Sequence, residues 1–150
     1  MKKDLSNIKK AKYLLDNNHC VAIPTETVYG LAANAYSDKA TSKIFKLKKR
    51  PKSNPLIVHY SRVQDLRKDC EINSNFQKLY SKFCPGPLTF VLKLKKESKI
   101  SKNVTNGKNT LAVRFPKNLA TRNLLSNLKY PLAAPSANIY TQLSPVSKKD

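Results

Sequence analysis

Residues 44–59 read I-F-K-L-K-K-R-P-K-S-N-P-L-I-V-H and contain a helix end, a polar loop and a strand. Apolar residues at helical spacing stop before Pro51, whose ring cannot continue a helix. The apolar run 56–58 then predicts a buried strand, and His59 follows it directly. A helix that leads through a cationic loop into a strand is typical of α/β proteins, which bind ligands in loops beyond strand ends.

The rest of the chain repeats this alternation of helical and strand patterns. Helices are predicted at residues 5–15, 38–47 with Asp38 as the cap, after Ser61, after Ser74, and at 119–128. Strands are predicted at residues 20–23, 56–58, 88–94, 110–115 and 132–134, with a polar loop at 103–109. Because some consecutive strands lack a long helix between them, we expect an open, twisted, mixed sheet with flanking helices.

Composition places the chain among single-domain proteins. Its 150 residues predict one domain over residues 1–150, long enough to bury a core without metal or disulfides. The three cysteines form no C-x-x-C pair, and with only two histidines no metal site is expected. No apolar run approaches a bilayer span, so we expect a cytoplasmic protein without a membrane partner.

The net charge of +20 is the strongest compositional signal. It would attract polyanions such as tRNA, or nucleoside triphosphates, by long-range steering. Lysines far outnumber arginines, so a solvated basic surface without a dedicated nucleic-acid face explains the charge equally well.

Three separated polar segments follow or adjoin apolar runs: residues 24–30, 48–59 and 135–138. In the second, Lys48 and Arg50 are suited to a pyrophosphate or triphosphate, although a solvated helix end would have the same composition. The first offers two hydroxyls and a carboxylate that could receive an ammonium group, or that could merely form a turn.

His59 and Arg114 are the two other candidate ligand-binding residues. His59 could orient a carboxylate or transfer a proton, although a lone histidine is more often structural. Arg114 lies between Val113 and Phe115 in a predicted strand, so it needs an anionic partner from the protein or from a ligand.

The sequence argues against several kinds of catalytic site. Three glycines cannot form a Walker A or dinucleotide-binding loop, Ser136 lacks a G-x-S-x-G context, and a two-acid mechanism lacks its second acid. Positioning and charge neutralisation remain, as in phosphoryl or nucleotidyl transfer.

These motifs resemble those of the YrdC-like L-threonylcarbamoyladenylate synthases. The resemblance covers most of the chain, in the family's order, over residues 24–30, 44–59, 84–91, 111–116 and 131–138. It implies an open twisted α/β sheet with a basic concave cavity. It also implies a nucleotidyltransferase that condenses L-threonine, bicarbonate and ATP, with Mg²⁺ accompanying ATP and pyrophosphate released. The product would serve threonylcarbamoyl modification of tRNA beside the anticodon, with tRNA and the threonylcarbamoyl-transfer machinery as partners.

The same resemblance implies the site residues. Lys48 and Arg50 would stabilise charge during the reaction. ATP would contact Lys48, Arg50, Asn54, Thr110, Ser136, Asn138 and Ser144. Threonine would contact Thr27, His59, Arg114 and the main chain near Ala134.

The chain departs from the family pattern in two places. Lys49 stands where the family commonly has glycine, which changes the freedom of the backbone there. Family members usually continue for several elements after residues 144–145, so we expect this domain to lack the last C-terminal elements. The alternative function is therefore a truncated, non-catalytic domain that binds double-stranded RNA or tRNA, although aromatic platforms are sparse.

Overall fold

The computed structural model describes residues 2–26 and 28–135. Its elements follow one another along the chain as α1 (Lys2–Asp16), β1 (Val21–Ile23), β2 (Gly30–Asn34), α2 (Asp38–Lys48), β3 (Ile57–His59), α3 (Val63–Leu66), α4 (Ser74–Phe83), β4 (Thr89–Lys93), α5 (Lys102–Thr105), β5 (Thr110–Arg114), α6 (Leu119–Ser126) and β6 (Leu132–Ala133).

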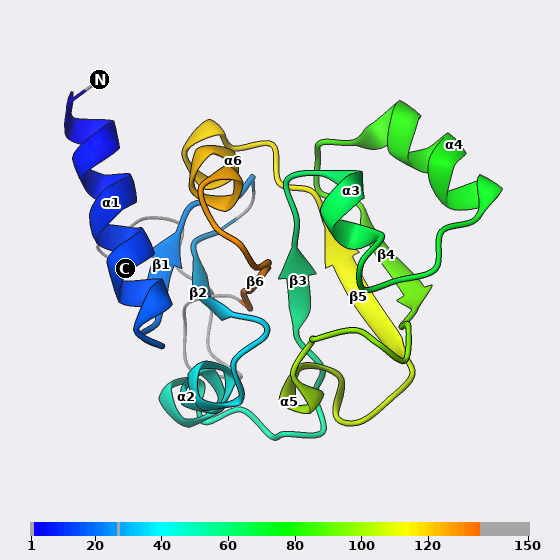
Figure 1. Ribbon diagram of the computed structural model, residues 1–150, viewed down its shortest axis with the longest axis horizontal. Coiled ribbons are helices and arrows are strands. Elements are labelled where there is room, and N and C mark those ends of the chain that lie inside the picture. Colours follow the sequence, from blue (N-terminus) through cyan, green and yellow to red (C-terminus); the bar gives the residue numbers. More distant parts are fainter. Residues whose placement is uncertain (1, 27, 136–150) are drawn as a thin grey trace.

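The strands form one mixed sheet in the order β1-β2-β6-β3-β5-β4 (Figure 1). β3 and β5 are parallel, and the other neighbouring pairs are antiparallel. The last strand, β6, lies between β2 and β3, so it joins the N-terminal hairpin to the rest of the sheet. The predicted open mixed sheet with flanking helices is confirmed.

The two faces of the sheet pack against different helices. α2, α3, α4 and α5 contribute to one apolar cluster, which includes Val58 and Val113 from the central strands. α1 and α6 contribute to a second cluster, which includes Leu132 of β6. Val91 of β4 is 67% exposed, so the described residues leave the β4 end of this second face uncovered.

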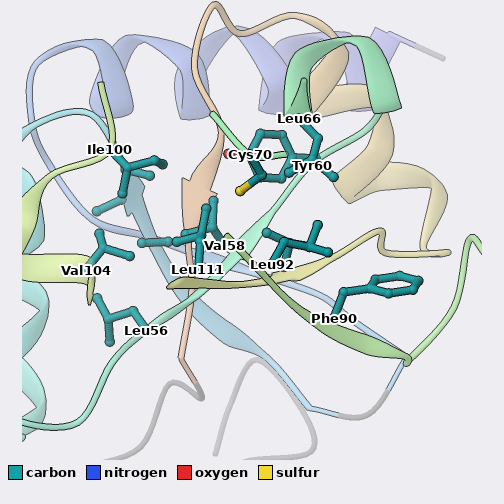
Figure 2. Packing of buried hydrophobic residues seen from close by; sticks show 14 of the residues in the cluster. Leu56, Val58, Tyr60, Leu66, Cys70, Phe90, Leu92, Ile100, Val104 and Leu111 are labelled. Carbon is teal, nitrogen blue, oxygen red and sulfur yellow. The ribbon is translucent and has the colours of Figure 1, made fainter. Parts of the chain in front are cut away.

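The larger cluster contains the bulk of the core (Figure 2). Side chains from β3, α3, β4, α5 and β5 meet there, and several of them have no exposed surface. Phe115 lies among the rings of Tyr60, Phe76, Tyr80 and Phe90, with the Tyr80 ring 4.9 Å from its centroid. This aromatic packing fixes the end of β5 immediately after Arg114.

Several local predictions were wrong. Strand β2 was not predicted, because the sequence G-L-A-A-N is rich in alanine and lacks the β-branched residues typical of strands. The cap of α2 is Ser37, whose hydroxyl accepts from the Ala40 amide, and not Asp38. Asn73 and not Ser74 caps α4, and the predicted loop at residues 103–109 contains most of α5. Competing polar residues at adjacent positions make such caps difficult to assign from sequence.

A buried carboxylate connects three loops on the α3 side of the sheet. Asp69 is 1% exposed and accepts hydrogen bonds from the hydroxyls of Tyr60 (2.7 Å), Tyr36 (2.9 Å) and Ser98 (2.7 Å). Burial and the nearby Asp69 charge raise the pKa of both tyrosines, so both remain hydroxyl donors at neutral pH. These donors compensate for the loss of water around the carboxylate.

Replacing Tyr60 with phenylalanine is expected to lower the free energy of unfolding by about 1.5–3 kcal/mol. The change removes one donor from a buried carboxylate while keeping the aromatic ring in place. Urea denaturation followed by circular dichroism measures the effect. Tyr13→Phe is the matched control because Tyr13 is 67% exposed. Equal stabilities for the two variants would contradict a stabilising role for the Tyr60–Asp69 bond.

Candidate functional site

Strand pairing places candidate site residues in one row across the sheet. His59 of β3 pairs with Arg114 of β5, and Arg114 pairs with Thr89 of β4. On its other side, His59 pairs with Leu132 of β6. Directly paired residues point to the same face of a sheet, and Leu132 belongs to the cluster formed with α1 and α6. This row therefore lies on the face of the sheet that packs against α1 and α6, and the β4 end of that face is uncovered by the described residues.

Ala134 and the nucleotide candidate Thr110 lie beyond this row, on the same face of the sheet. The Ala134 amide donates to the Ile57 carbonyl at 3.0 Å. Thr110 lies four residues before Arg114 in β5, so both side chains point to one face. Thr110 is exposed there, whereas Ala134 is 6% exposed. A Cβ on Gly30 would come within 3.3 Å of the Ala134 Cβ, so the close approach of these two chain segments favours glycine.

Arg114 is held by a hydroxyl and not by a carboxylate. Its Nε and Nη2 atoms donate to Thr89 Oγ1 at 3.1 and 2.6 Å. The ion pairs found in the described part of the chain are Lys12–Asp16, Arg62–Asp65 and Lys68–Asp65, and none of them includes Arg114. The guanidinium is half-buried and oriented, and it is suited to a ligand carboxylate.

His59 is a neutral, buried imidazole. Burial and, next, the Arg114 charge lower its pKa to about 4, against an opposing hydrogen bond to the Leu132 backbone. Within the residues that the structure describes, His59 Nδ1 is the buried side-chain atom that lacks a hydrogen-bond partner. An orphaned ring nitrogen in a polar row is unusual in proteins, and its lone pair can accept from a hydroxyl or an amine.

Lys48 and Arg50 form the second part of the site, before β3. Lys48 ends α2 and is only 2% exposed, so it is not a solvated helix end. Arg50 Nε donates to the Asn54 carbonyl at 3.2 Å, and Nη2 donates to the Pro55 carbonyl at 2.9 Å. Arg50 thus organises the loop that leads into β3, and it lies beside Asn54, another residue with a predicted ATP contact.

Lys49 adopts a left-handed backbone conformation, which glycine enters most easily. Its φ of 52° and ψ of 38° are left-handed, and it forms the C-cap of α2. Glycine enters this region without the steric cost of a Cβ, whereas lysine adopts it at a cost of about 1 kcal/mol. Lys48 and Arg50 flank this left-handed residue at the end of α2.

Four predicted site residues lie outside the described residues: Thr27, Ser136, Asn138 and Ser144. Their predicted contacts with threonine and ATP stay predictions, as does the basic concave cavity. A cavity of about 330 Å³ lies elsewhere, between α3 and α6, and Tyr36, Arg62 and Tyr130 contribute to its wall. No cluster of three potential metal ligands occurs in residues 2–26 and 28–135. No helix in this part is long and apolar enough to cross a membrane.

Sequence reasoning missed Thr89, which orients Arg114. The available signal was the two-residue alternation of the predicted strand, which puts Thr89, Val91 and Lys93 on one face. The identity of the neighbouring strand depends on tertiary pairing, so the sequence could not connect Thr89 with Arg114.

Nucleotide binding is expected to take up protons at pH 8 to 8.5. Burial and the adjacent Arg50 charge lower the pKa of Lys48 to about 8, so the amine is partly neutral in that range. A bound polyphosphate favours the charged amine and raises this pKa, so a proton is gained on binding, and the uptake disappears well below the unliganded pKa.

Calorimetric titrations with ATP in buffers of different ionisation enthalpy measure this proton uptake. Lys48→Gln should abolish it, and Lys46→Ala should not. A binding heat that is independent of the buffer at pH 8 would contradict a phosphate near Lys48.

Three comparisons place the chain among known proteins. The model of the family Sua5_yciO_yrdC, described as "Telomere recombination", matches residues 13–150. A threonylcarbamoyl-AMP synthase of Pyrococcus abyssi is 41% identical over 93% of this chain and 41% of its own length. One of Bacillus subtilis is 42% identical over 92% of this chain and 40% of its own length. The chain therefore spans about two fifths of these relatives.

Solved structures agree with this similarity. The crystal structure of P. abyssi Sua5 complexed with L-threonine has a TM-score of 0.91 and 39% identity, and the match covers 96% of this chain and 42% of that one. Full-length HypF in a phosphate- and nucleotide-bound form has a TM-score of 0.85 and 25% identity. This match covers 95% of this chain and 18% of the HypF chain.

Proposed function

Because the chain belongs to the Sua5–YciO–YrdC family, we propose that it makes threonylcarbamoyl-AMP from L-threonine, bicarbonate and ATP. The observation that supports this most directly is the row formed by His59, Arg114 and Thr89. It combines an oriented guanidinium with a neutral ring nitrogen that lacks a partner among the described residues. An amino acid with a side-chain hydroxyl supplies partners for both groups.

In this proposal, Arg114 binds the threonine carboxylate with guanidinium donors that do not contact Thr89. His59 is neutral because of its low pKa, and it contacts a hydroxyl or amine of the substrate through Nδ1. A neutral imidazole beside Arg114 avoids repulsion between two cations in a buried place. The Ala134 segment forms the adjoining wall of the site.

In the same proposal, Lys48 and Arg50 bind the phosphates of the nucleotide. His59 lies four positions after Pro55, whose carbonyl Arg50 holds, and four steps of extended chain span roughly 13 Å at about 3.3 Å per residue. That separation is suited to a ligand with an amino acid at one end and a phosphate chain at the other. Lys48 and Arg50 would then offset the negative charge that grows on the phosphates during transfer.

The proposed reaction requires no covalent enzyme intermediate. The threonine amine takes up the carbon of bicarbonate to form a carbamate, with loss of water. A carbamate oxygen then attacks the α-phosphate of ATP, and the bond to the β-phosphate oxygen breaks to release pyrophosphate. Magnesium accompanies ATP as part of the substrate. The residues described above contribute by positioning and charge neutralisation.

Pyrophosphate release tests this proposal. The purified chain is incubated with ATP, magnesium and bicarbonate, with and without L-threonine, after circular dichroism has shown that it is folded. Release that depends on both threonine and bicarbonate supports the synthase. Release that is equal without threonine, or a folded chain that does not bind threonine, would refute it.

The net charge favours RNA binding as a second candidate function. A non-catalytic module would bind double-stranded RNA or tRNA with an affinity that falls steeply with salt and does not depend on ATP. We propose tRNA and the threonylcarbamoyl-transfer machinery as the corresponding partners of the synthase. Salt titrations of tRNA binding, with and without ATP, separate the module from the enzyme.

A further inference from the structure

Glu26 lies in the loop between β1 and β2 and contacts a segment about ninety residues further along the chain. Its Oε1 atom accepts hydrogen bonds from the backbone amides of Lys117 and Asn118, the latter at 2.9 Å. Asn118 is the N-cap of α6, where a carboxylate is also stabilised by the helix dipole. The carboxylate is therefore bound to the start of α6 and does not lie free in a turn.

A second contact fastens the same loop to the same helix. The hydroxyl of Thr121, in the first turn of α6, donates to the Pro24 carbonyl. Thr121 is 1% exposed, and its own amide donates to the Asn118 side chain at 3.2 Å. Two residues of the loop, Pro24 and Glu26, are thus attached to residues 117–121.

These contacts connect two chain segments that adjoin the amino-acid site, the β1–β2 loop and the segment after β5. Lys117 follows Arg114 by three residues, so the amides that Glu26 holds belong to the segment that leaves β5. The Glu26 charge also raises the pKa of His59, whereas the Arg114 charge lowers it, so Glu26 acts electrostatically on the same imidazole. Glu26 is exposed, and most of the core does not depend on it.

We propose that Glu26 is a positioning residue for the amino-acid half of the site, because its carboxylate fixes the β1–β2 loop against the segment that follows Arg114. This inference rests on the proposed function. Loss of the contact lets the loop and the end of β5 move apart, which weakens threonine binding. Lys48 and Arg50 lie on a different connection, between α2 and β3, so nucleotide binding is unaffected.

The test compares Glu26→Ala, Glu26→Gln and the exposed control Glu97→Ala. Calorimetry measures the binding of L-threonine and of a non-hydrolysable ATP analogue to each. Glu26→Ala should weaken threonine binding by roughly tenfold or more, because two charge-assisted bonds are lost, and should leave analogue binding within about twofold. Glu26→Gln should recover most of the affinity, since an amide oxygen can still accept from both amides. Amide hydrogen exchange at Lys117 and Asn118 should accelerate in the alanine variant only.

The outcomes separate this inference from the proposed function. If the wild-type chain does not bind threonine, the proposed function is refuted and the inference is refuted with it. If the wild-type chain binds threonine and Glu26→Ala binds it equally well, the inference alone is overturned. Equal losses in the alanine and glutamine variants would show that Glu26 acts through its charge, as a receptor for the substrate ammonium group. Equal losses of threonine affinity and of analogue affinity would show that Glu26 has a general structural role, and this would overturn the inference.

Discussion

Replacing Arg114 with alanine is expected to reduce threonine-dependent pyrophosphate release by about thirtyfold to several thousandfold. Removing one partner of a desolvated charge pair costs about 2–5 kcal/mol, and each 1.4 kcal/mol corresponds to about tenfold in affinity. Arg114 has no carboxylate partner among the described residues, so the lost partner is the substrate. The effect should appear in the Michaelis constant for threonine, whereas ATP affinity should remain within about twofold.

Arg114→Lys and Arg122→Ala complete this experiment. Lysine keeps the charge but loses the fork of donors held by Thr89, so an intermediate loss is expected. Arg122 lies exposed on α6, and its removal should have no effect. If Arg114→Ala retained wild-type threonine dependence, the assignment of this residue to the substrate carboxylate would be wrong.

Replacing Arg50 with alanine is expected to weaken ATP binding by roughly a hundredfold to ten-thousandfold. Loss of two charge-assisted hydrogen bonds at about 1.5–3 kcal/mol each gives this range. The same change releases the Asn54 and Pro55 carbonyls, so part of the effect arises from a loosened loop. Equilibrium dialysis with labelled ATP measures the affinity, and circular dichroism checks that the sheet is intact.

Lys52→Ala is the matched control for Arg50, because Lys52 lies exposed in the same loop. It removes an equal charge without removing a contact to the loop carbonyls, so it should change ATP affinity by no more than about threefold at physiological salt. Equal losses in the two variants would indicate that only the overall charge attracts the nucleotide. Unchanged affinity in Arg50→Ala would remove Arg50 from the ATP site.

The sequence predicted the local elements well because their patterns depend on residues close in the chain. Helical spacing in α1, α2, α4 and α6 and the apolar runs of β3, β4 and β5 were confirmed. The motif around Lys48 and Arg50 and the family resemblance were also available from sequence. Strand β2 was missed because its alanines carry little β propensity, and only its pairing with β1 and β6 stabilises it as a strand.

Sequence patterns alone were enough to predict most of the helices and strands, the charged segments and the family resemblance. Three features became visible only in the folded chain: β6 lies between β2 and β3, Thr89 holds Arg114, and Glu26 binds the start of α6. The burial of Lys48 is another such feature. Helix and strand preferences depend on neighbouring residues, whereas pairings between distant segments and the burial of a charge depend on the packing of the whole sheet.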